Sequence, residues 1–288
     1  MRPAFYADQF YPGDKAELRK QIENFFGSLE LGKQHKKIYG VVVPHAGYIF
    51  SGRTAAYAYK TLKQADTKPD LIVIFGTNHS SYDKIVIAQE DFSMPLGIVK
   101  NSEISRKITE ELEREGFKVG TSEREHSIEV QLPFLQYFMK KFEIIPIIVS
   151  NLSLEECKKI ARIVYDNIIN IKINEIKGGK DIKEGKDRKV FVLASSDFSH
   201  YGSNYSYHNK NFQKDDKTAV NEILKLNSDS FLKQAGKLTI CGNIAIACTI
   251  ELCKLLGARK AELLDFSDSS EIFGDRNSIV DYASILFV

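Results

Sequence analysis

The 288-residue chain carries 40 Lys and Arg side chains against 38 Asp and Glu, so it lacks the bulk charge that attracts nucleic acid or an anionic membrane. Its 43% hydrophobic and 27% charged residues are typical of a soluble globular protein that folds without disulfides, and its length allows one large α/β domain or two small ones. No apolar run approaches the roughly 20 residues of a membrane-spanning helix, and Met1 to Tyr6 lacks the apolar segment of a signal peptide, so we expect a cytoplasmic protein.

The first predicted elements lead to a histidine. Asp14, with Glu17 three residues later, resembles a capping box and predicts a helix to about Phe26. An apolar strand over residues 38–43 then ends at Pro44 and is followed by His45. A glycine turn and a helix over residues 54–62 come next. In an open α/β sheet the carboxyl ends of the strands line the ligand crevice, so His45 is a candidate site residue.

A second strand, over residues 71–75, also ends in a glycine turn that carries a histidine, His79. His45 and His79 lie one βαβ unit apart in sequence, so we expect their strands to be parallel neighbours with both histidines at one edge of the sheet. The turn has too few glycines for a phosphate-binding loop.

The next segment combines a surface helix and a histidine–glutamate pair. We predict a strand over residues 84–88, a loop over 91–97 and an amphipathic helix over 102–115 that Gly116 closes. His126 and Glu129 stand three residues apart and would share a helical face. That spacing suits a metal or supporting pair, and equally an exposed ion pair at a helix start.

A third histidine follows another buried strand. We predict a strand over residues 143–149, a capped helix from about 153 to 170, and an exposed charged loop over 172–189. The strand at 190–194 runs into a polar turn that contains Asp197 and His200. Ser195 or Ser196 is a weak candidate for a hydrolase nucleophile, because no G-x-S-x-G elbow surrounds it.

Cys241 is the cysteine with a chemical role in this reading. After a helix at about 218–226, it precedes an apolar helix over residues 244–256 that Gly257 caps, and a closing strand follows at 279–288. The helix dipole predicts a lowered pKa and a thiolate, which is either a nucleophile or a metal ligand. The other three cysteines (157, 248 and 253) are expected in the core, and the absence of a CxxC pair argues against a structural zinc site.

These strand ends predict a metal centre. Two histidines and a thiolate at one crevice would give three ligands with open coordination positions, as in catalytic rather than structural sites, and iron, copper and zinc all accept such donors. His200 and Asp197 would supply an acid/base or supporting pair beside it.

Five ordered motifs resemble the Memo family, whose members are similar in fold to LigB-type class III extradiol dioxygenases. They are Pro44-His45-Ala46-Gly47-Tyr48, Gly76-Thr77-Asn78-His79, Glu125-His126-Ser127-Ile128-Glu129, Ser196-Asp197-Phe198-Ser199-His200-Tyr201-Gly202 and Cys241-Gly242-Asn243.

The resemblance implies a single domain over residues 1–288 with an α/β fold, a three-layer α/β/α sandwich with a mainly parallel sheet. It implies His45, His79 and Cys241 as ligands of one mononuclear transition metal, with iron(II) favoured over copper or zinc. The dioxygenases complete their ligand set with a carboxylate, where this chain has Cys241. The resemblance also implies a small-molecule or peptide ligand in the cleft.

Two functions therefore follow as hypotheses. The first is a metal-dependent oxidoreductase in which His200 is the acid/base and Asp197 and His126 orient it or the substrate. The alternative is a non-enzymatic module that binds a peptide or a metal in the same cleft. A third, weaker reading is a Cys–His hydrolase that uses Cys241 and His200.

Overall fold

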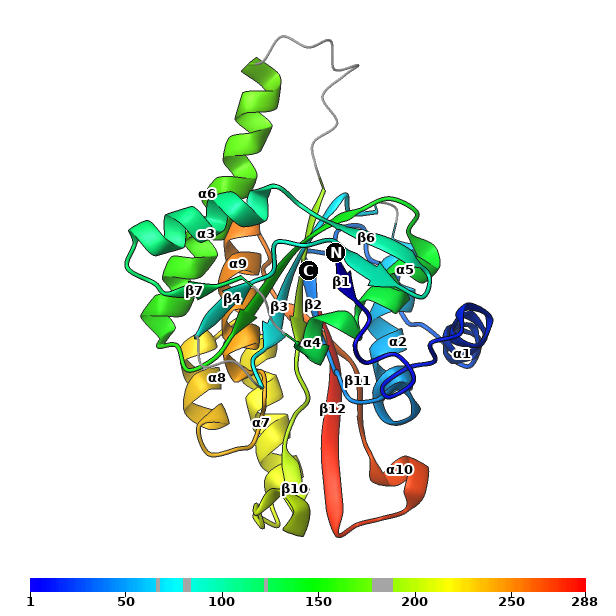
Figure 1. Ribbon diagram of the computed structural model, residues 1–288. Coiled ribbons are helices and arrows are strands. Elements are labelled where there is room, and N and C mark those ends of the chain that lie inside the picture. Colours follow the sequence, from blue (N-terminus) through cyan, green and yellow to red (C-terminus); the bar gives the residue numbers. More distant parts are fainter. Residues whose placement is uncertain (66–67, 80–83, 122–123, 178–188) are drawn as a thin grey trace.

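The computed structural model describes residues 1–65, 68–79, 84–121, 124–177 and 189–288, which form a three-layer α/β/α sandwich (Figure 1). The strands are β1 (Arg2–Pro3), β2 (Gly40–Val43), β3 (Leu71–Thr77), β4 (Ile85–Ile87), β5 (Phe92–Met94), β6 (Gly97–Asn101), β7 (Val119–Gly120), β8 (Glu143–Val149), β9 (Val190–Ser195), β10 (His200–Gly202), β11 (Ala261–Asp268) and β12 (Ser278–Phe287). The helices are α1 (Lys15–Gly27), α2 (Tyr48–Gln64), α3 (Ile104–Arg114), α4 (His126–Glu129), α5 (Leu132–Phe138), α6 (Leu154–Lys177), α7 (Phe212–Leu224), α8 (Ser228–Ala235), α9 (Asn243–Leu256) and α10 (Ser270–Phe273), with a 3₁₀ turn, η1 (Ser203–Tyr205).

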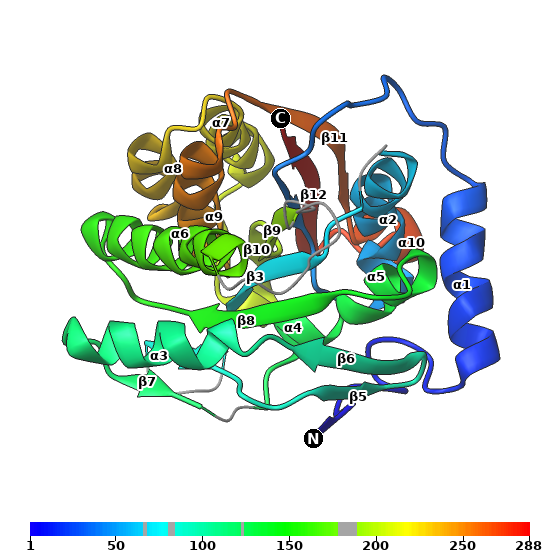
Figure 2. The same cartoon turned by 90° about the horizontal axis from the view of Figure 1, so that it is seen from above.

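The middle of the sheet is parallel, in the order β8-β3-β9-β2, and β12 pairs antiparallel with β2. Alternate side chains of these apolar strands point to opposite faces. In β3, Leu71, Val73 and Phe75 join one core, while Ile72 and Ile74 join the other. Helices cover both faces, α3 and α6–α9 on one side and α1, α2 and α5 on the other (Figure 2). This explains why the strands are apolar along their whole length.

Several predicted elements have the expected ends. Asp14 caps α1 by accepting hydrogen bonds from the N–H groups of Ala16 and Glu17. The capping box at the start of α6 is present, since the N–H of Ser153 donates to Glu156 and the N–H of Glu156 donates to Ser153 Oγ. Gly257 ends α9 with a φ of 108°, a conformation that favours glycine.

The strand neighbours predicted for the two histidines are wrong. β2 and β3 are parallel, but β9 lies between them and pairs with both. The βαβ spacing correctly predicted that the two strands are parallel. It could not predict that β9, which comes later in the chain, lies between them. The insertion brings the β9 turn, with Ser195 and Asp197, between the two histidine turns.

Other boundaries differ from the prediction. α2 begins at Tyr48 rather than 54. Gly52, which was assigned to a turn, lies inside the helix, and its missing side chain leaves room for the Phe25 ring of α1, which a Cβ would approach to 2.5 Å. The predicted loop at 91–97 contains β5, which pairs with β6. α7 begins at Phe212, and β11 and α8 were not predicted. α6 runs to Lys177, so the predicted loop 172–189 is helical at its start, and residues 178–188 lie outside the described residues.

Candidate metal centre

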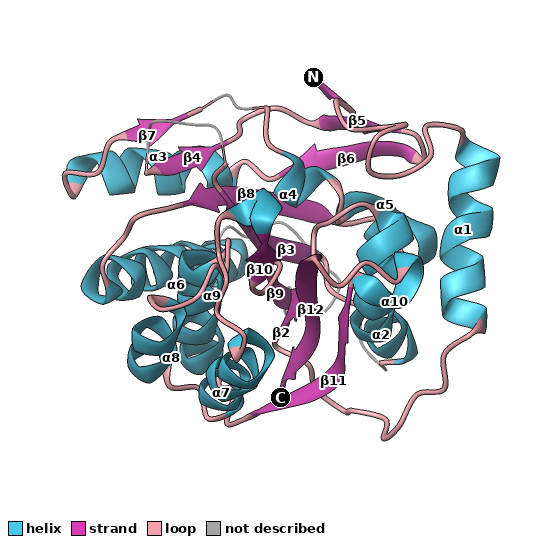
Figure 3. Ribbon diagram, turned by 90° about the horizontal axis from the view of Figure 1, so that it is seen from below, coloured by secondary structure: helices cyan, strands magenta, loops and turns pink. Residues whose placement is uncertain are grey.

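The side chains predicted as metal ligands gather at the carboxyl ends of the central strands, the edge that Figure 3 views. His45 and His79 each follow by two residues the end of their strand, β2 and β3. Cys241 precedes α9 by two residues. One nitrogen of each histidine and the Cys241 sulfur all lie within 4.8 Å of one another.

The spacing of His45 and Cys241 suits a shared metal. His45 Nε2 lies 3.2 Å from Cys241 Sγ. Nitrogen and sulfur ligands of one tetrahedral ion would stand about 3.6 Å apart, given metal–nitrogen and metal–sulfur bonds of about 2.05 and 2.3 Å. A shift of a few tenths of an ångström would therefore admit a metal between them.

The hydrogen bonds around His45 fix which ring nitrogen carries the proton. Ser195 Oγ has one proton and donates it to the carbonyl of Ser127, while it accepts from Gln131 Nε2 at 2.8 Å. His45 Nδ1, 3.1 Å from the same oxygen, must therefore be a donor. Burial lowers the pKa of His45 to about 3, so its ring is neutral at physiological pH. The Nε2 lone pair consequently points toward Cys241.

Glu125 orients the other two histidines, and sequence reasoning missed it. Glu125 Oε1 accepts hydrogen bonds from Nδ1 of His79 at 3.0 Å and from Nδ1 of His126 at 3.1 Å. Its Oε2 accepts the main-chain N–H of His79 at 2.9 Å. Although burial alone would raise the pKa of Glu125, the bonds from His126 and His79 hold it well below its ordinary value. Because a carboxylate only accepts, both rings carry their proton on Nδ1 and leave Nε2 free.

The rings of His79 and His126 stack, with centroids 4.6 Å apart, and His45 stands edge-on to both. His79, Glu125 and His126 form a second group with metal-binding potential. The sequence feature that could have revealed the role of Glu125 is its position directly before His126. Its side chain also caps α4 there.

The predicted pairing of His126 with Glu129 is wrong. Glu129 is fully buried and accepts hydrogen bonds from Arg2 Nη1 at 2.5 Å and from the Tyr11 hydroxyl at 2.6 Å, as well as from two main-chain N–H groups of the N-terminal segment. It therefore fastens residues 2–11 to α4, and that segment brings the Phe10 ring to 4.6 Å from the His126 ring. His126 lies against Glu125 instead.

Asp197 and His200 do not meet as predicted. Asp197 Oδ1 accepts the N–H of His45 at 2.8 Å, and its Oδ2 lies 3.9 Å from His45 Nε2. His200 Nδ1 instead lies 3.1 Å from the carbonyl of Thr239, and its ring packs edge-on against Tyr205. Asp197 thus stands beside the candidate ligands, while Thr239 orients His200.

The prediction for the Cys241 thiol is also wrong in direction. Burial raises the pKa of Cys241, and the neighbouring Asp197 carboxylate raises it further. These effects outweigh the hydrogen bonds at the sulfur that lower its pKa. Without a metal the sulfur therefore keeps its proton, which weakens the reading as a free nucleophile. Ser195 is fully buried and committed to His45, Gln131 and Ser127, which argues against a serine nucleophile.

The sequence matches the family model described as Memo-like protein over residues 2–286. The chain belongs to the Memo family. It is 35% identical to a MEMO1 family protein of Nitrosopumilus maritimus, with both chains covered completely, and 36% identical to one of Methanosarcina barkeri, with 99% of each covered. A MEMO1 family protein of Pyrococcus abyssi is 34% identical, with 97% of each chain covered. The resemblance inferred from the five motifs is thus confirmed at the level of the family.

Among the described helices of this Memo-family chain, none has the length and apolar character needed to cross a membrane.

Proposed function

We propose that this Memo-family protein binds one mononuclear transition metal through His45, His79 and Cys241 and acts as a metal-dependent oxidoreductase. The observation that carries the proposal is the convergence of two imidazole nitrogens and one sulfur within 4.8 Å, drawn from three separate segments. A mixed nitrogen and sulfur donor set suits iron, copper and zinc, and the family resemblance favours iron(II). Three protein ligands leave coordination positions for a substrate.

The surroundings support metal binding rather than ordinary packing. His45 is a neutral imidazole with its Nε2 lone pair toward the sulfur, and Glu125 leaves Nε2 of His79 equally available. Each candidate histidine ligand thus has a hydrogen-bond partner on the ring nitrogen away from the site, the arrangement usual for metal-binding histidines. A bound iron or copper ion would supply redox chemistry and would polarise a substrate placed beside it.

The protein's own groups would then bind substrate and move protons. Asp197 Oδ2 faces the ligand side of His45 and is an acceptor for a substrate hydroxyl. His126 keeps its Nδ1 proton on Glu125, so its Nε2 is the atom able to accept a proton near the site. His200 is the acid/base at the outer part of the cleft in this proposal, with Thr239 holding its Nδ1.

The competing proposal is a binding module that uses the same cleft without catalysis. Exposed apolar side chains, Ile49 and Phe50, follow directly after the His45 turn, at the start of α2. Such groups suit contact with a peptide or another apolar ligand. Oxygen consumption that requires metal and disappears in Cys241→Ser would favour the enzyme, and tight peptide binding that resists chelation would favour the module.

The deciding experiment is elemental analysis of untagged protein purified without oxygen, alongside His45→Ala, His79→Ala and Cys241→Ser. We expect about one iron or copper ion per chain in the wild type and strong loss in each variant. Cys253→Ser serves as a control, because Cys253 is fully buried in α9 away from the histidines. Wild-type protein that contains no metal and cannot be loaded, with unaltered folding, would refute the proposal.

A further inference from the structure

A pocket of about 610 Å³ opens at the opposite end of the sheet from the metal centre. It is bordered by the segment that leads into β2, by the turn after α9 and by the end of β12. Figure 2 shows the segment after α1 passing beside the C-terminal end of the chain, and the N–H of Tyr39 donates to the carbonyl of Phe287 there. Because α9 has 14 residues and begins near Cys241, about 21 Å of helix separates the two sites.

The lining of this pocket is strongly basic. Lys33, Lys36 and Lys37 come from the segment before β2, and Arg259 and Lys260 follow the turn after α9. Lys260 pairs with Glu262 at 2.5 Å, and the buried His35 also faces that carboxylate, at 3.6 Å. The other four cations have no ion-pair partner among the residues that the structure describes. The whole chain is nearly neutral, so this clustering is local.

Structural needs account for only part of that charge. The carboxyl end of α9 carries the equivalent of about half a negative charge, which Arg259 or Lys260 alone would balance. Glu262 balances one more cation. At least two positive charges remain in excess, and like charges at one pocket repel each other. Such an excess creates a positive local potential that attracts anions.

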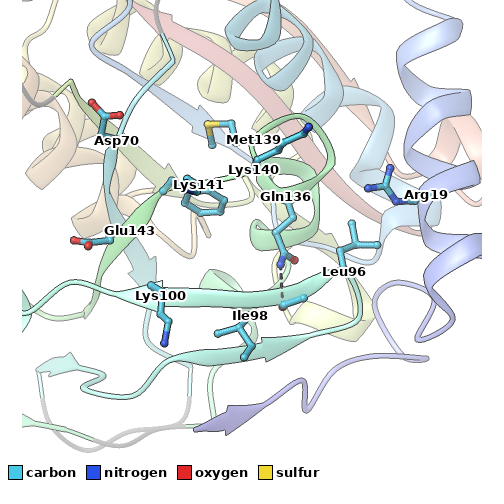
Figure 4. Close-up of a pocket in the computed structure, with 12 residues that line it drawn as sticks. Arg19, Asp70, Leu96, Ile98, Lys100, Gln136, Met139, Lys140, Lys141 and Glu143 are labelled. Carbon is cyan, nitrogen blue, oxygen red and sulfur yellow. Dashed lines mark hydrogen bonds between the residues drawn. The ribbon is translucent and has the colours of Figure 1, made fainter. Parts of the chain in front are cut away.

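A pocket elsewhere on the molecule provides a contrast. It has about 650 Å³, and its charged lining residues are Arg19, Lys100, Lys140 and Lys141 together with Asp70 and Glu143 (Figure 4). Lys100 pairs with Asp91 at 2.6 Å, so three carboxylates lie at or beside four cations there. A pocket of comparable volume therefore has an excess of one cation there once Asp91 is counted, whereas five cations and one carboxylate line the pocket beside Tyr39.

The shape of the basic pocket suits a small molecule. Its volume lies within the range of about 300–1,000 Å³ that is usual for small-molecule sites. Tyr39 provides an aromatic wall, with Lys37 Nζ 4.5 Å from the ring centroid, and Gly257 turns tightly enough that a Cβ would lie 3.1 Å from the Tyr39 hydroxyl. We propose that this pocket binds a small anion that carries two or more phosphate groups, either a nucleoside diphosphate or inorganic polyphosphate.

Calorimetric titration with ADP, pyrophosphate and adenosine tests this proposal. We expect ADP, pyrophosphate or both to bind at one site and adenosine to bind at least tenfold more weakly, because the charged groups provide the attraction. ADP alone would identify a nucleotide, and equal binding of both would identify the phosphates as the determinant. Lys36→Glu/Arg259→Glu should weaken binding by about tenfold or more.

Matched controls separate this site from bulk charge and from the metal centre. Lys140→Glu/Lys141→Glu changes the net charge equally at the pocket of Figure 4 and should leave the affinity within about twofold. His79→Ala should also bind normally. Failure of both anions to bind at about 10 mM would overturn the proposal, as would equal loss in the two charge-reversal variants, or loss in His79→Ala. Tighter binding of single-stranded RNA than of ADP would overturn the small-molecule assignment.

Discussion

Replacing Glu125 with Gln tests whether one carboxylate orients two histidines of the metal centre. The two Glu125 oxygens accept four N–H groups: Nδ1 of His79, Nδ1 of His126, and the main-chain N–H groups of His79 and Ser127. Gln offers one acceptor oxygen and one amide donor. If the Gln oxygen replaces Oε1, the Gln amide NH₂ faces the main-chain N–H of His79. In the opposite orientation the amide NH₂ faces the three N–H donors that Oε1 accepts in the wild type.

The better orientation therefore loses charge assistance on three hydrogen bonds and places two donors together at His79. Loss of such a supporting partner typically weakens metal binding by about 10–100-fold, or about 1.4–2.8 kcal/mol. We expect Glu125→Gln to lower the affinity of folded protein for iron(II) within that range, measured by competition with a chelator. Nitrogen NMR should also show weaker hydrogen bonds from the Nδ1–H groups of His79 and His126.

Glu129→Gln is the matched control, since Glu129 lies on the same short helix and is equally buried but contacts Arg2 and Tyr11 rather than a histidine. It should lower the free energy of unfolding, because Arg2 loses a buried counter-charge. Its metal affinity, measured on folded protein, should stay within about twofold of the wild type. Unchanged affinity in Glu125→Gln, or equal weakening in both variants, would refute the positioning role.

Two further changes test the packing and the protonation of the site's surroundings. Gly242→Ala should destabilise the fold by about 1–3 kcal/mol and reduce bound metal, because the added Cβ would lie 2.5 Å from Ser196 Cβ beside Cys241. Gly27→Ala, whose Cβ meets no atom within 4 Å, should do neither, and urea unfolding with metal analysis distinguishes them. Burial raises the pKa of Asp281 to about 9, and the charge of Asp216 adds to the effect. The native state therefore holds a proton that the unfolded state has lost, so this group's contribution to stability falls as the pH rises from about 4 to about 9. Asp281→Asn removes this titration, so its stability relative to the wild type should rise as the pH increases from 5 to 8.5; parallel stability curves for the two proteins would contradict this.

The comparison of His79 with Glu129 shows where sequence reasoning holds. His79 follows a strand that is apolar along its length, and such a strand can only be buried between helical layers, so the position of its end follows from local pattern. Glu129 was assigned from helical spacing alone. α4 is a single turn, and the N-terminal segment, more than 110 residues away in sequence, supplies the partners of Glu129. No local sequence pattern could predict the contact between Glu129 and the N-terminal segment.

The sequence by itself predicted the fold class, the family and the candidate ligands. The fold class follows from the alternation of strands and helices together with the family resemblance, the family from five ordered motifs, and the candidate ligands from residue types at strand ends and before α9, all of which are local properties. Only the tertiary structure decided that β9 lies between β2 and β3, that Glu125 rather than Glu129 serves the histidines, and that the Cys241 thiol keeps its proton. The physical reason is that strand order, hydrogen-bond partners and desolvation depend on groups far apart in the chain, whose positions are fixed when the layers pack.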